Sequence, residues 1–460
     1  MYERAGVFFM RNPFSLISVF LSGPVMVWGV SVIGILVSFG TRFVQIRLFA
    51  RSVKTVLFGA KKGKTGQISS FQAVTAALSG TIGTGNIAGV AIALASGGAG
   101  AIFWMWISAF FGMAVKFAEI TLAVRFRERK DGRFVGGPMY YLTDAVGKRT
   151  GKLFVWLCIC SSFFVGNMVQ ANTAFGALLE ITPMAPQTLM LLFLILGVVT
   201  GIVLAGGMGR IVSVTQVLVP VMAALYLFGC IVVVVLHPAS CLKALCSIVT
   251  EAFSLKSVTG GIGGSMLMQS MRVGCTKGVF TNEAGLGSAP IAHAAAACES
   301  PAAQGMFGIF EVFFDTIVMC TLTSVVILSS GVPFDSAEDG IHITLAAFAQ
   351  TFGQTAHVLI AVSVLFFAFA AILSWGGYGD SCLLFLNRKR RARRIYHCLY
   401  AVSVFLGTVF PVLSLWELSD LLNGLMMVPN LFGIILLLPV VKEEVGKMNR
   451  TKIDLHCPKK

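Results

Sequence analysis

The feature that most constrains this chain is a succession of long apolar runs separated by short polar loops. There are eleven of them, at about 24–46, 70–95, 99–124, 153–181, 188–206, 211–236, 259–297, 303–331, 355–386, 395–413 and 421–441. A helix needs about 20 apolar residues to cross the hydrocarbon core of a bilayer, where its backbone can bond only to itself. The sequence therefore predicts an all-α integral membrane protein with about eleven transmembrane helices.

The charged residues support a membrane protein and argue against a nucleic-acid-binding protein. They make up 12% of the chain, against about 25% in a soluble domain. The net charge of +15 would suit a nucleic acid, but the basic residues are spread over short loops and form no basic domain. We therefore expect membrane lipid with anionic headgroups as their partner, and no nucleic acid.

The loops also predict the orientation. Lys and Arg gather in the loops 47–64, 125–152 and 387–394, whereas the loop 332–354 has none. By the positive-inside rule, the basic loops face the cytoplasm. In an eleven-span protein of the inner (plasma) membrane, this places the N-terminus outside and the C-terminal tail, 442–460, in the cytoplasm.

Two of the apolar runs, 70–95 and 259–297, differ from the others because they are rich in Gly, Ser and Thr. If the run 24–46 is set aside as an extra first helix, these two open two sets of five helices, 70–236 and 259–441. An odd number of spans inverts the second set relative to the first. Interrupted helices at matching positions of inverted halves point to the binding site of a secondary transporter. We therefore predict a five-plus-five inverted-repeat core.

The first interruption is expected at Gly83-Thr84-Gly85-Asn86. Glycine lets the backbone leave the helix, and an unwound segment inside a membrane is tolerated only where it lines a cavity or binds something. Freed N–H groups favour a carboxylate and freed carbonyls favour a cation. The alternative is that these glycines serve only close helix packing.

The second interruption is expected between Gly274 and Gly285. Thr281 or Asn282 would N-cap the inner half-helix, with Glu283 in its first turn. Charges at this depth are costly and usually face the interior of the bundle. Lys277 and Glu283 would then either take part in function or form a structural pair that pins the break.

Other polar residues lie inside apolar runs. Lys116 and Glu119 share a helix face and suggest a gate or a packing salt bridge. Gln170 suits the polar ends of a zwitterion or an interhelical hydrogen bond. Trp375 is either the wall of a pocket or a packed core aromatic. The remaining intramembrane polar residues are Asn167, Asn172, Glu311, Asp315 and Asp380, and His293 is expected to be an interfacial or packing histidine.

The segments outside the core carry less information. Residues 1–23 have no cleavage-site pattern and contain Arg4, Arg11 and Pro13 within an apolar stretch, so we interpret them as an interfacial lead-in. Cys241 and Cys246 share a loop, but spacing alone does not decide whether they form a disulfide.

Signatures of catalysis are missing from the sequence. It has no zinc-protease motif, nucleophile elbow or Walker loop, and its six His residues are scattered. We expect neither an enzyme nor a cofactor. A sensor or channel that binds without coupled transport remains an alternative, although the charged ring of many ion filters is missing.

Several motifs resemble those of the alanine or glycine:cation symporter family, within the amino acid–polyamine–organocation superfamily. They lie at 83–90, 97–112, 136–141 and 282–290, and at Trp375 with Tyr378 and Gly379. The resemblance runs from about residue 40 to 440, and the stretch 97–112 is the most specific part.

The resemblance implies a LeuT-like transporter that takes up alanine, glycine or a similar small neutral amino acid, driven by sodium as the coupling ion. It implies substrate contacts in the two broken helices and at two further positions. These residues are Thr84, Gly85, Asn86, Gln170, Gly274, Gly278, Asn282 and Trp375. A sodium ion would lie near the carbonyls of Ser79 and Ile82, opposite hydroxyls on the run 355–386.

The chain also departs from the family pattern. Lys277 stands where the family usually has Arg, Ala371 where it has Thr, and Gly377 where it has Tyr. Lysine keeps the charge but lacks the planar fork of arginine. The lost hydroxyls leave open a proton-coupled transporter, or one that is selective for another small amino acid such as serine or D-alanine.

Overall fold

The helices of this protein are seen in a computed structural model. The structure describes residues 26–58, 68–130, 132–181, 184–253, 262–298, 300–334, 340–386 and 389–450. The predicted lead-in 1–23 and the end of the predicted tail, beyond residue 450, therefore lie outside the described residues.

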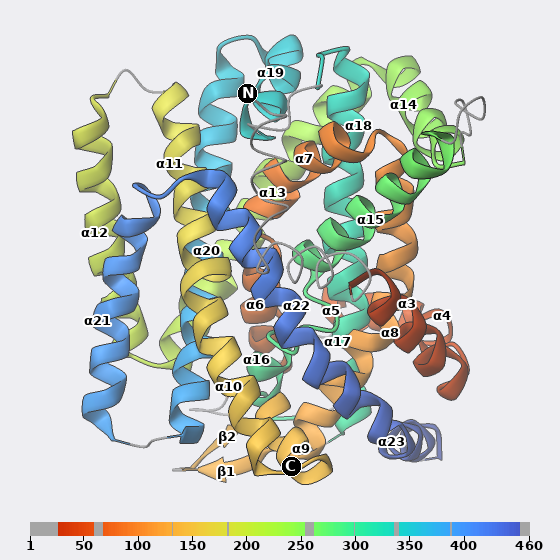
Figure 1. Cartoon of the computed structure of the whole chain (residues 1–460), viewed down its shortest axis with the longest axis vertical. Helices are drawn as coiled ribbons and strands as arrows, with labels where there is room; N and C mark the ends of the chain where they lie inside the picture. Colours follow the sequence, from red (N-terminus) through yellow and green to blue (C-terminus); the bar gives the residue numbers. More distant parts are fainter. Residues whose placement is uncertain are drawn as a thin grey trace.

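The first half of the chain forms one leading helical region and the helices of the predicted first repeat (Figure 1). The elements are α3 (Met26–Gly40), α4 (Val44–Arg47), α5 (Phe49–Phe58), α6 (Ser70–Thr81), η2 (Thr84–Asn86), α7 (Ala88–Gly97), α8 (Gly100–Arg125), α9 (Pro138–Ala145), α10 (Lys148–Phe163), η3 (Phe164–Met168), α11 (Val169–Ile181), α12 (Pro186–Ala205), α13 (Met208–Leu236) and α14 (Pro238–Glu251). A short antiparallel hairpin of β1 (Glu128–Lys130) and β2 (Arg133–Val135) follows α8, with Arg129 paired to Phe134.

The second half contains the helices of the predicted second repeat. The elements are α15 (Ile262–Asn282), α16 (Pro290–Ala294), α17 (Pro301–Val312), η4 (Phe313–Cys320), α18 (Thr321–Ser330), α19 (Gly340–Phe352), α20 (Thr355–Leu386), α21 (Arg390–Gly407), α22 (Val412–Leu436) and α23 (Leu438–Arg450). η3 and η4 are π-helical turns inside otherwise continuous helices, and such turns are frequent at functional sites.

Each of the eleven predicted runs contains helix. Among the described residues, seven helices are long and apolar enough to cross a membrane, and α3 and α7 are shorter apolar helices. The structure is nearly all helical and supports the predicted membrane class, whereas the number of eleven crossings stays a prediction.

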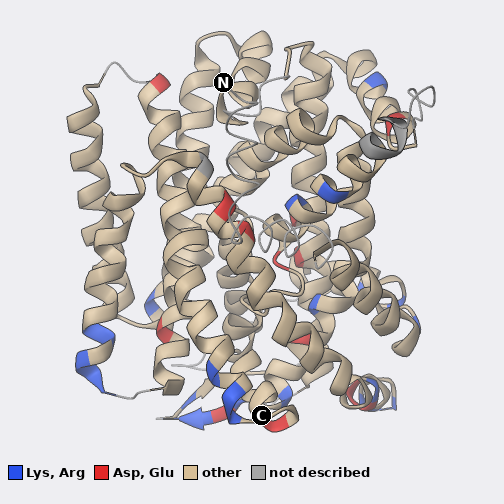
Figure 2. Cartoon of the chain, viewed as in Figure 1, with Lys and Arg blue, Asp and Glu red and all other residues tan. Residues whose placement is uncertain are grey.

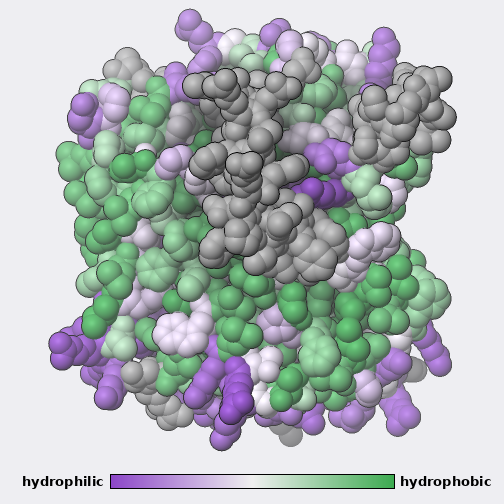
Figure 3. All heavy atoms as spheres, in the orientation of Figure 1, coloured by the Kyte–Doolittle hydropathy of each residue, from purple (hydrophilic) through white to green (hydrophobic). Residues whose placement is uncertain are grey.

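Burial separates an inner from an outer part of the bundle. α8 is buried along most of its length and packs against α15, α17 and α3, and α20 packs against α6 and α13. α12 and α21 lie side by side at one edge in Figure 1. Exposed large apolar side chains are frequent on α12 and α13, and hydrophobic residues cover much of the left and the lower right of the face in Figure 3. These helices are the ones expected to face lipid.

Lys and Arg gather at the end of the molecule that holds the hairpin and the start of α21 (Figure 2). This is the end that contains the basic loops expected in the cytoplasm.

Both predicted interruptions exist, but the second lies later than expected. α6 ends at Thr81 and α7 begins at Ala88, with the single turn η2 between them. α15, by contrast, continues through Gly274 and Gly278 to Asn282, and the break covers 283–289. The backbone is left-handed at Glu283 (φ 54°), Gly285 (φ 88°) and Gly287 (φ 79°).

The predicted N-cap at this break is wrong. Thr281 and Asn282 lie at the end of α15, and Ala289 precedes α16 without a side-chain cap. The helix continues past Gly274 because this glycine lies against α8, where a Cβ atom would come within 2.2 Å of the Ala101 carbonyl oxygen. Gly274 therefore allows close helix packing and does not form a turn.

Candidate functional site

The first break is held by side chains that bond to its backbone. Gly83 N donates to Asn86 Oδ1 at 3.1 Å. Thr84 donates to Gln170 Oε1 from both its backbone N and its hydroxyl, each at 3.0 Å. Gln170 is on α11, directly after the π-helical turn η3. The structure thus brings together Thr84, Asn86 and Gln170, three of the predicted site residues.

Gly85 connects the first break to the second. A Cβ atom there would lie 3.1 Å from the Thr281 side chain and 3.2 Å from the Phe280 ring, both at the end of α15. The two broken helices therefore approach each other at this glycine, and a larger residue would press against Phe280.

Asn86 also bonds to Asp315, which was not among the predicted site residues. Asn86 Nδ2 donates to Asp315 Oδ1 at 2.7 Å, and the Thr316 hydroxyl donates to Asp315 Oδ2 at 2.9 Å. Asn282 Nδ2 donates to Thr316 Oγ1 at 3.1 Å. A continuous chain of hydrogen bonds therefore runs from the first break through the π-helical turn η4 to the end of α15.

These side chains are shielded from solvent. Thr84, Asn86, Asp315 and Thr316 are each 0% exposed. Asp315 could have been identified from the sequence as a site residue because it is an acidic residue inside an apolar run. The π-helical turn that carries Asp315 and Thr316 was not visible in the sequence.

The predicted sodium position is bounded by a hydroxyl pair. The Ser79 hydroxyl on α6 hydrogen-bonds to the Ser374 hydroxyl on α20, and Ser374 Oγ donates to Ala76 O at 2.8 Å. Ile82 follows α6 with a non-helical backbone, φ −76° and ψ 86°. Hard cations prefer such oxygen ligands. Sodium binding near Ser79 and Ile82 stays a prediction.

Trp375 lies one residue after Ser374 and is 1% exposed. A Cβ atom on Gly166 in η3 would come within 2.0 Å of the indole Cγ, so the ring packs directly on the π-helical turn that precedes Gln170. Its position is compatible with a pocket wall and with a packed core aromatic.

Gly274 and Gly278 both face α8. A Cβ atom on Gly278 would lie 3.5 Å from Ser108 Oγ, and the Thr281 hydroxyl donates to Gly278 O at 2.9 Å. Their contact with a substrate stays a prediction.

The second break is surrounded by buried charge. Lys116 Nζ donates to Asn282 O at 3.0 Å and lies 4.0 Å from Glu311 Oε2. The Ser288 hydroxyl donates to the Glu283 carboxylate across the unwound segment. Asn430 on α22 donates to both Glu119 and Gly285 O. The irregular backbone is thus held by Lys116 of α8, by Asn430 of α22 and by its own Ser288–Glu283 bond.

Two expectations about these charges are wrong. Lys277 Nζ bonds to Asp420 Oδ2 at 3.1 Å, so Lys277 and Glu283 do not form the suggested pair. His293 is not a packing residue alone, because its Nε2 lies 2.6 Å from Glu311 Oε1. Asp420 on α22 is 143 residues away from Lys277, whereas Glu311 on α17 is 18 residues away from His293.

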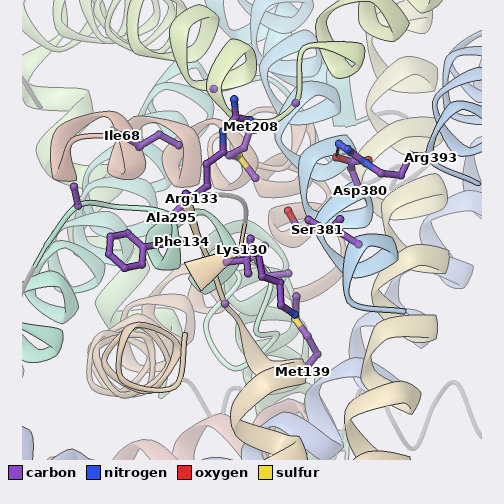
Figure 4. Close-up of a pocket in the computed structure, with 18 residues that line it drawn as sticks. Ile68, Lys130, Arg133, Phe134, Met139, Met208, Ala295, Asp380, Ser381 and Arg393 are labelled. Carbon is purple, nitrogen blue, oxygen red and sulfur yellow. Dashed lines mark hydrogen bonds and ion pairs between the residues drawn. The ribbon is translucent and has the colours of Figure 1, made fainter. Parts of the chain in front are cut away.

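A cavity of about 390 Å³ opens where the start of α6 meets the end of α16 (Figure 4). Its wall includes Ile68, just before α6, and Ala295, just after α16. Lys130 and Arg133 of the hairpin form another side, and Asp380 faces Arg393 in the close-up. Arg393 Nε donates to Asp380 Oδ1 at 2.8 Å. The cavity lies at the end of the molecule where basic residues gather.

The same end ties the two broken helices together. Ala297 N donates to Ile68 O at 2.8 Å. The Arg127 guanidinium donates to the carbonyls of Ala294, Ala296 and Cys298 and lies 3.8 Å from the centre of the Phe134 ring. α6 and α16 are therefore joined to each other and to the hairpin.

Two interrupted helices that meet at buried polar groups inside an apolar bundle define a multi-pass membrane transporter of the secondary type. The chain belongs to the sodium:alanine symporter family, whose sequence model matches residues 8–457. Members of this family are cation-coupled amino acid symporters, and the chain is a transporter and not an enzyme.

Relatives with assigned names cover nearly the whole chain. The sodium/alanine symporter AgcS of Methanococcus maripaludis is 36% identical over 94% of this chain and 96% of its own length. The probable sodium/glutamine symporter GlnT of Bacillus subtilis is also 36% identical, over 93% of this chain and 89% of its own length.

Solved structures share the fold at low identity. A Na⁺-coupled sialic acid symporter in a substrate-bound, outward-open state matches with a TM-score of 0.57 and 14% identity, over 96% of this chain and 99% of its own. MhsT in complex with L-phenylalanine matches with a TM-score of 0.52 and 13% identity, over 84% and 90%. These likenesses establish the LeuT-like transporter fold.

Proposed function

We propose that this chain is a sodium-coupled symporter that carries a small neutral amino acid, alanine or glycine, into the cytoplasm. The observation that carries the proposal is the environment of Asp315. This carboxylate is fully buried and accepts hydrogen bonds from the Asn86 amide and the Thr316 hydroxyl. Lys116 acts on it electrostatically, but among the described residues no basic side chain hydrogen-bonds to it. A buried carboxyl group is stable either protonated or beside a cation, and a sodium ion beside Asp315 and Asn86 would supply the cation.

The first break suits the substrate because its polar groups are uncharged. The start of α7 presents backbone N–H groups and the positive end of the helix dipole to a carboxylate. Thr84, Gly85 and Gln170 offer neutral donors and acceptors around it. We assign the substrate to these residues together with Asn282 and Trp375, and we assign Gly274 and Gly278 to helix packing.

A second sodium position is proposed near Ser79 and Ile82. Ala371 lacks the hydroxyl that the family usually has there, but Ser374 lies one turn further along α20 and bonds to Ser79. The proposed sodium position therefore keeps one hydroxyl of α20, that of Ser374, although residue 371 has none.

We also propose the membrane arrangement. The basic end with the hairpin and α23 would face the cytoplasm, with the N-terminus outside, in the inner (plasma) membrane. The helices of 70–236 and 259–441 would form the two inverted repeats behind the extra helix α3, and anionic lipid would contact the basic end.

The direct test is uptake of labelled alanine and glycine by proteoliposomes with an inward sodium gradient. We expect accumulation above the outside concentration, and the Asp315→Asn variant should lose the dependence on sodium. Asp144→Asn is the matched control, because Asp144 is exposed on α9 and should behave as the unchanged protein.

The same assay separates the alternatives. Absence of sodium-dependent accumulation of either amino acid would contradict the proposal. Accumulation driven by a pH gradient alone would indicate a proton-coupled transporter, and preference for serine, D-alanine or glutamine would change the substrate. Equilibration without accumulation would indicate a channel.

A further inference from the structure

Asn423 on α22 is a buried side chain whose hydrogen-bonding groups are unused. It is 0% exposed, and neither its amide nitrogen nor its amide oxygen has a hydrogen-bond partner among the described residues. The hydroxyl of Ser419, one turn earlier on the same helix, is equally buried and also lacks a partner there. Buried polar side chains of native proteins are nearly always bonded. A bound small molecule or a water molecule is the natural partner of such an amide.

The face of α22 that carries Asn423 is identified by the contacts of its neighbours. Residues three or four apart share a face of a helix, and Trp416, Asp420 and Asn423 have this spacing. The centre of the Trp416 ring lies 4.7 Å from that of the Phe280 ring. Asp420 Oδ2 accepts a hydrogen bond from Lys277 Nζ at 3.1 Å. Asn423 is therefore on the face of α22 that lies against the end of α15.

The same face continues to the second break. Met427 and Asn430 follow Asn423 at spacings of four and seven residues. A Cβ atom on Gly285 would lie 3.7 Å from Met427 Cγ, and Asn430 Nδ2 donates to Gly285 O at 2.8 Å. Asn423 thus lies between the level of Lys277 and the level of Gly285, beside the last turn of α15.

This position is next to the elements that hold the proposed substrate. α22 packs against α15 and also against η3 and α11. The Trp375 ring lies on η3, and α11 carries Gln170. The Phe280 ring, at the end of α15, lies 3.2 Å from the place of a Cβ atom on Gly85 in the first break. These contacts place Asn423 at a side of the proposed substrate site that no other assigned residue occupies.

The unused groups on this face suit a neutral polar side chain. An asparagine amide both donates and accepts, so it can pair with another carboxamide through two reciprocal N–H···O bonds. The Ser419 hydroxyl adds a further donor and acceptor. The charged groups of this face, Lys277 and Asp420, bond to each other. An apolar side chain would leave both amide atoms of Asn423 without partners, which is costly inside a protein.

We propose that Asn423 and Ser419 form a subsite for the side chain of the transported amino acid, and that a neutral amino acid with a carboxamide side chain is a substrate besides alanine and glycine. The inference rests on the proposed function, since it extends the same binding site. Alanine and glycine leave the subsite to water, whereas the amide of asparagine or glutamine fills it.

The first experiment uses the similar size and shape of asparagine and leucine, both as substrates and as residues. Sodium-driven uptake of labelled alanine is measured in proteoliposomes with unlabelled asparagine or leucine as the competitor. In the unchanged protein, asparagine should compete at least about tenfold better than leucine, and Asn423→Leu should reverse this order. The same order and ratio in both proteins would overturn the subsite, and would mean that the amide binds only water.

Asn172→Leu is the matched control for this competition. Asn172 is an amide on α11 that already bonds to carbonyls at the end of α21, so its loss should keep the preference for asparagine. The same reversal in Asn172→Leu as in Asn423→Leu would overturn the assignment of the preference to α22.

The second experiment does not depend on transport. Thermal unfolding of the full-length protein in detergent with sodium is followed with and without asparagine. Without an amino acid, the unfolding midpoint of Asn423→Leu should equal or exceed that of the unchanged protein, because an apolar side chain replaces an amide without partners. Asparagine should raise the midpoint of the unchanged protein and not that of Asn423→Leu, with Ser419→Ala in between. A lower midpoint of Asn423→Leu without an amino acid would show that the amide has a structural partner, and would overturn the subsite.

The two experiments together separate two failures. If alanine accumulates with sodium but asparagine neither competes nor raises the midpoint, the subsite fails and the proposed function stands. If no amino acid accumulates, yet asparagine raises the midpoint of the unchanged protein and not that of Asn423→Leu, the proposed function fails while the subsite stands.

Discussion

The two interrupted helices are stabilised by different chemistry. At the first break, the amides of Gln170 and Asn86 bond to backbone N–H groups of Gly83 and Thr84. At the second break, Lys116, Glu283 and their partners hold the unwound backbone with charged groups. Neutral hydrogen bonds contribute about 0.5–1.5 kcal/mol each, whereas breaking a buried ion pair costs about 3–5 kcal/mol. The first break can therefore exchange its bonds for those of a ligand, and the second keeps its shape.

The largest effect is expected where the second break loses its lysine. Lys116→Met should lower the free energy of unfolding by about 3–5 kcal/mol, because Glu311 would be left buried without this cation. Thermal unfolding in detergent measures this loss. Lys148→Met is the control at an exposed site, and the double variant with Glu311→Gln should recover part of the loss. Unchanged stability of Lys116→Met would show that the two breaks do not differ in this way.

The next largest effect concerns the first break and the proposed ion. Asn86→Ala removes the donor to the Asp315 carboxylate, a kind of bond that contributes about 1.5–3 kcal/mol. Sodium-driven uptake should fall at least about tenfold, with normal insertion into the membrane. Asn172→Ala is the matched control on α11, since Asn172 bonds to carbonyls at the end of α21. Normal uptake by Asn86→Ala would separate the first break from transport.

A third prediction tests whether Trp375 belongs to the substrate pocket. Trp375→Phe shortens an aromatic wall next to η3, and a change of pocket size by about a methylene is worth about 1–3 kcal/mol in discrimination between substrates. Uptake of a larger neutral amino acid relative to alanine should rise several-fold in competition assays. If the variant lowers only expression and leaves this ratio unchanged, Trp375 is a core residue.

The smallest effect is expected at Gln170. Gln170→Leu removes a neutral acceptor from Thr84, so the concentration of alanine at half-maximal uptake should rise about two- to tenfold, while stability changes little. Gln187→Leu, at an exposed position near the start of α12, is the control. A collapse in stability as large as that of Lys116→Met would mean that the first break also depends on its side chains for shape.

Much of the site could be predicted from the sequence. The cluster of glycines at 83–85 next to Asn86 predicted the first break, and the family resemblance placed Gln170 with it among the substrate contacts. Asp315 was recognised as an intramembrane acid but not as the partner of Asn86, since 229 residues separate the two. The π-helical turn that orients it depends on packing, which no local pattern records.

The sequence by itself determined the membrane class, the apolar runs, the two interrupted helices and the family, because hydropathy and glycine-rich motifs are local properties of the chain. Only the tertiary structure decided where the second break lies, which carboxylate faces Asn86, and that His293 pairs with Glu311. A glycine can permit either a turn or a close helix contact, and a buried charged side chain pairs with whichever partner the fold brings next to it. Gly274 against Ala101 and Lys277 against Asp420 show that these choices are made by neighbours distant in sequence.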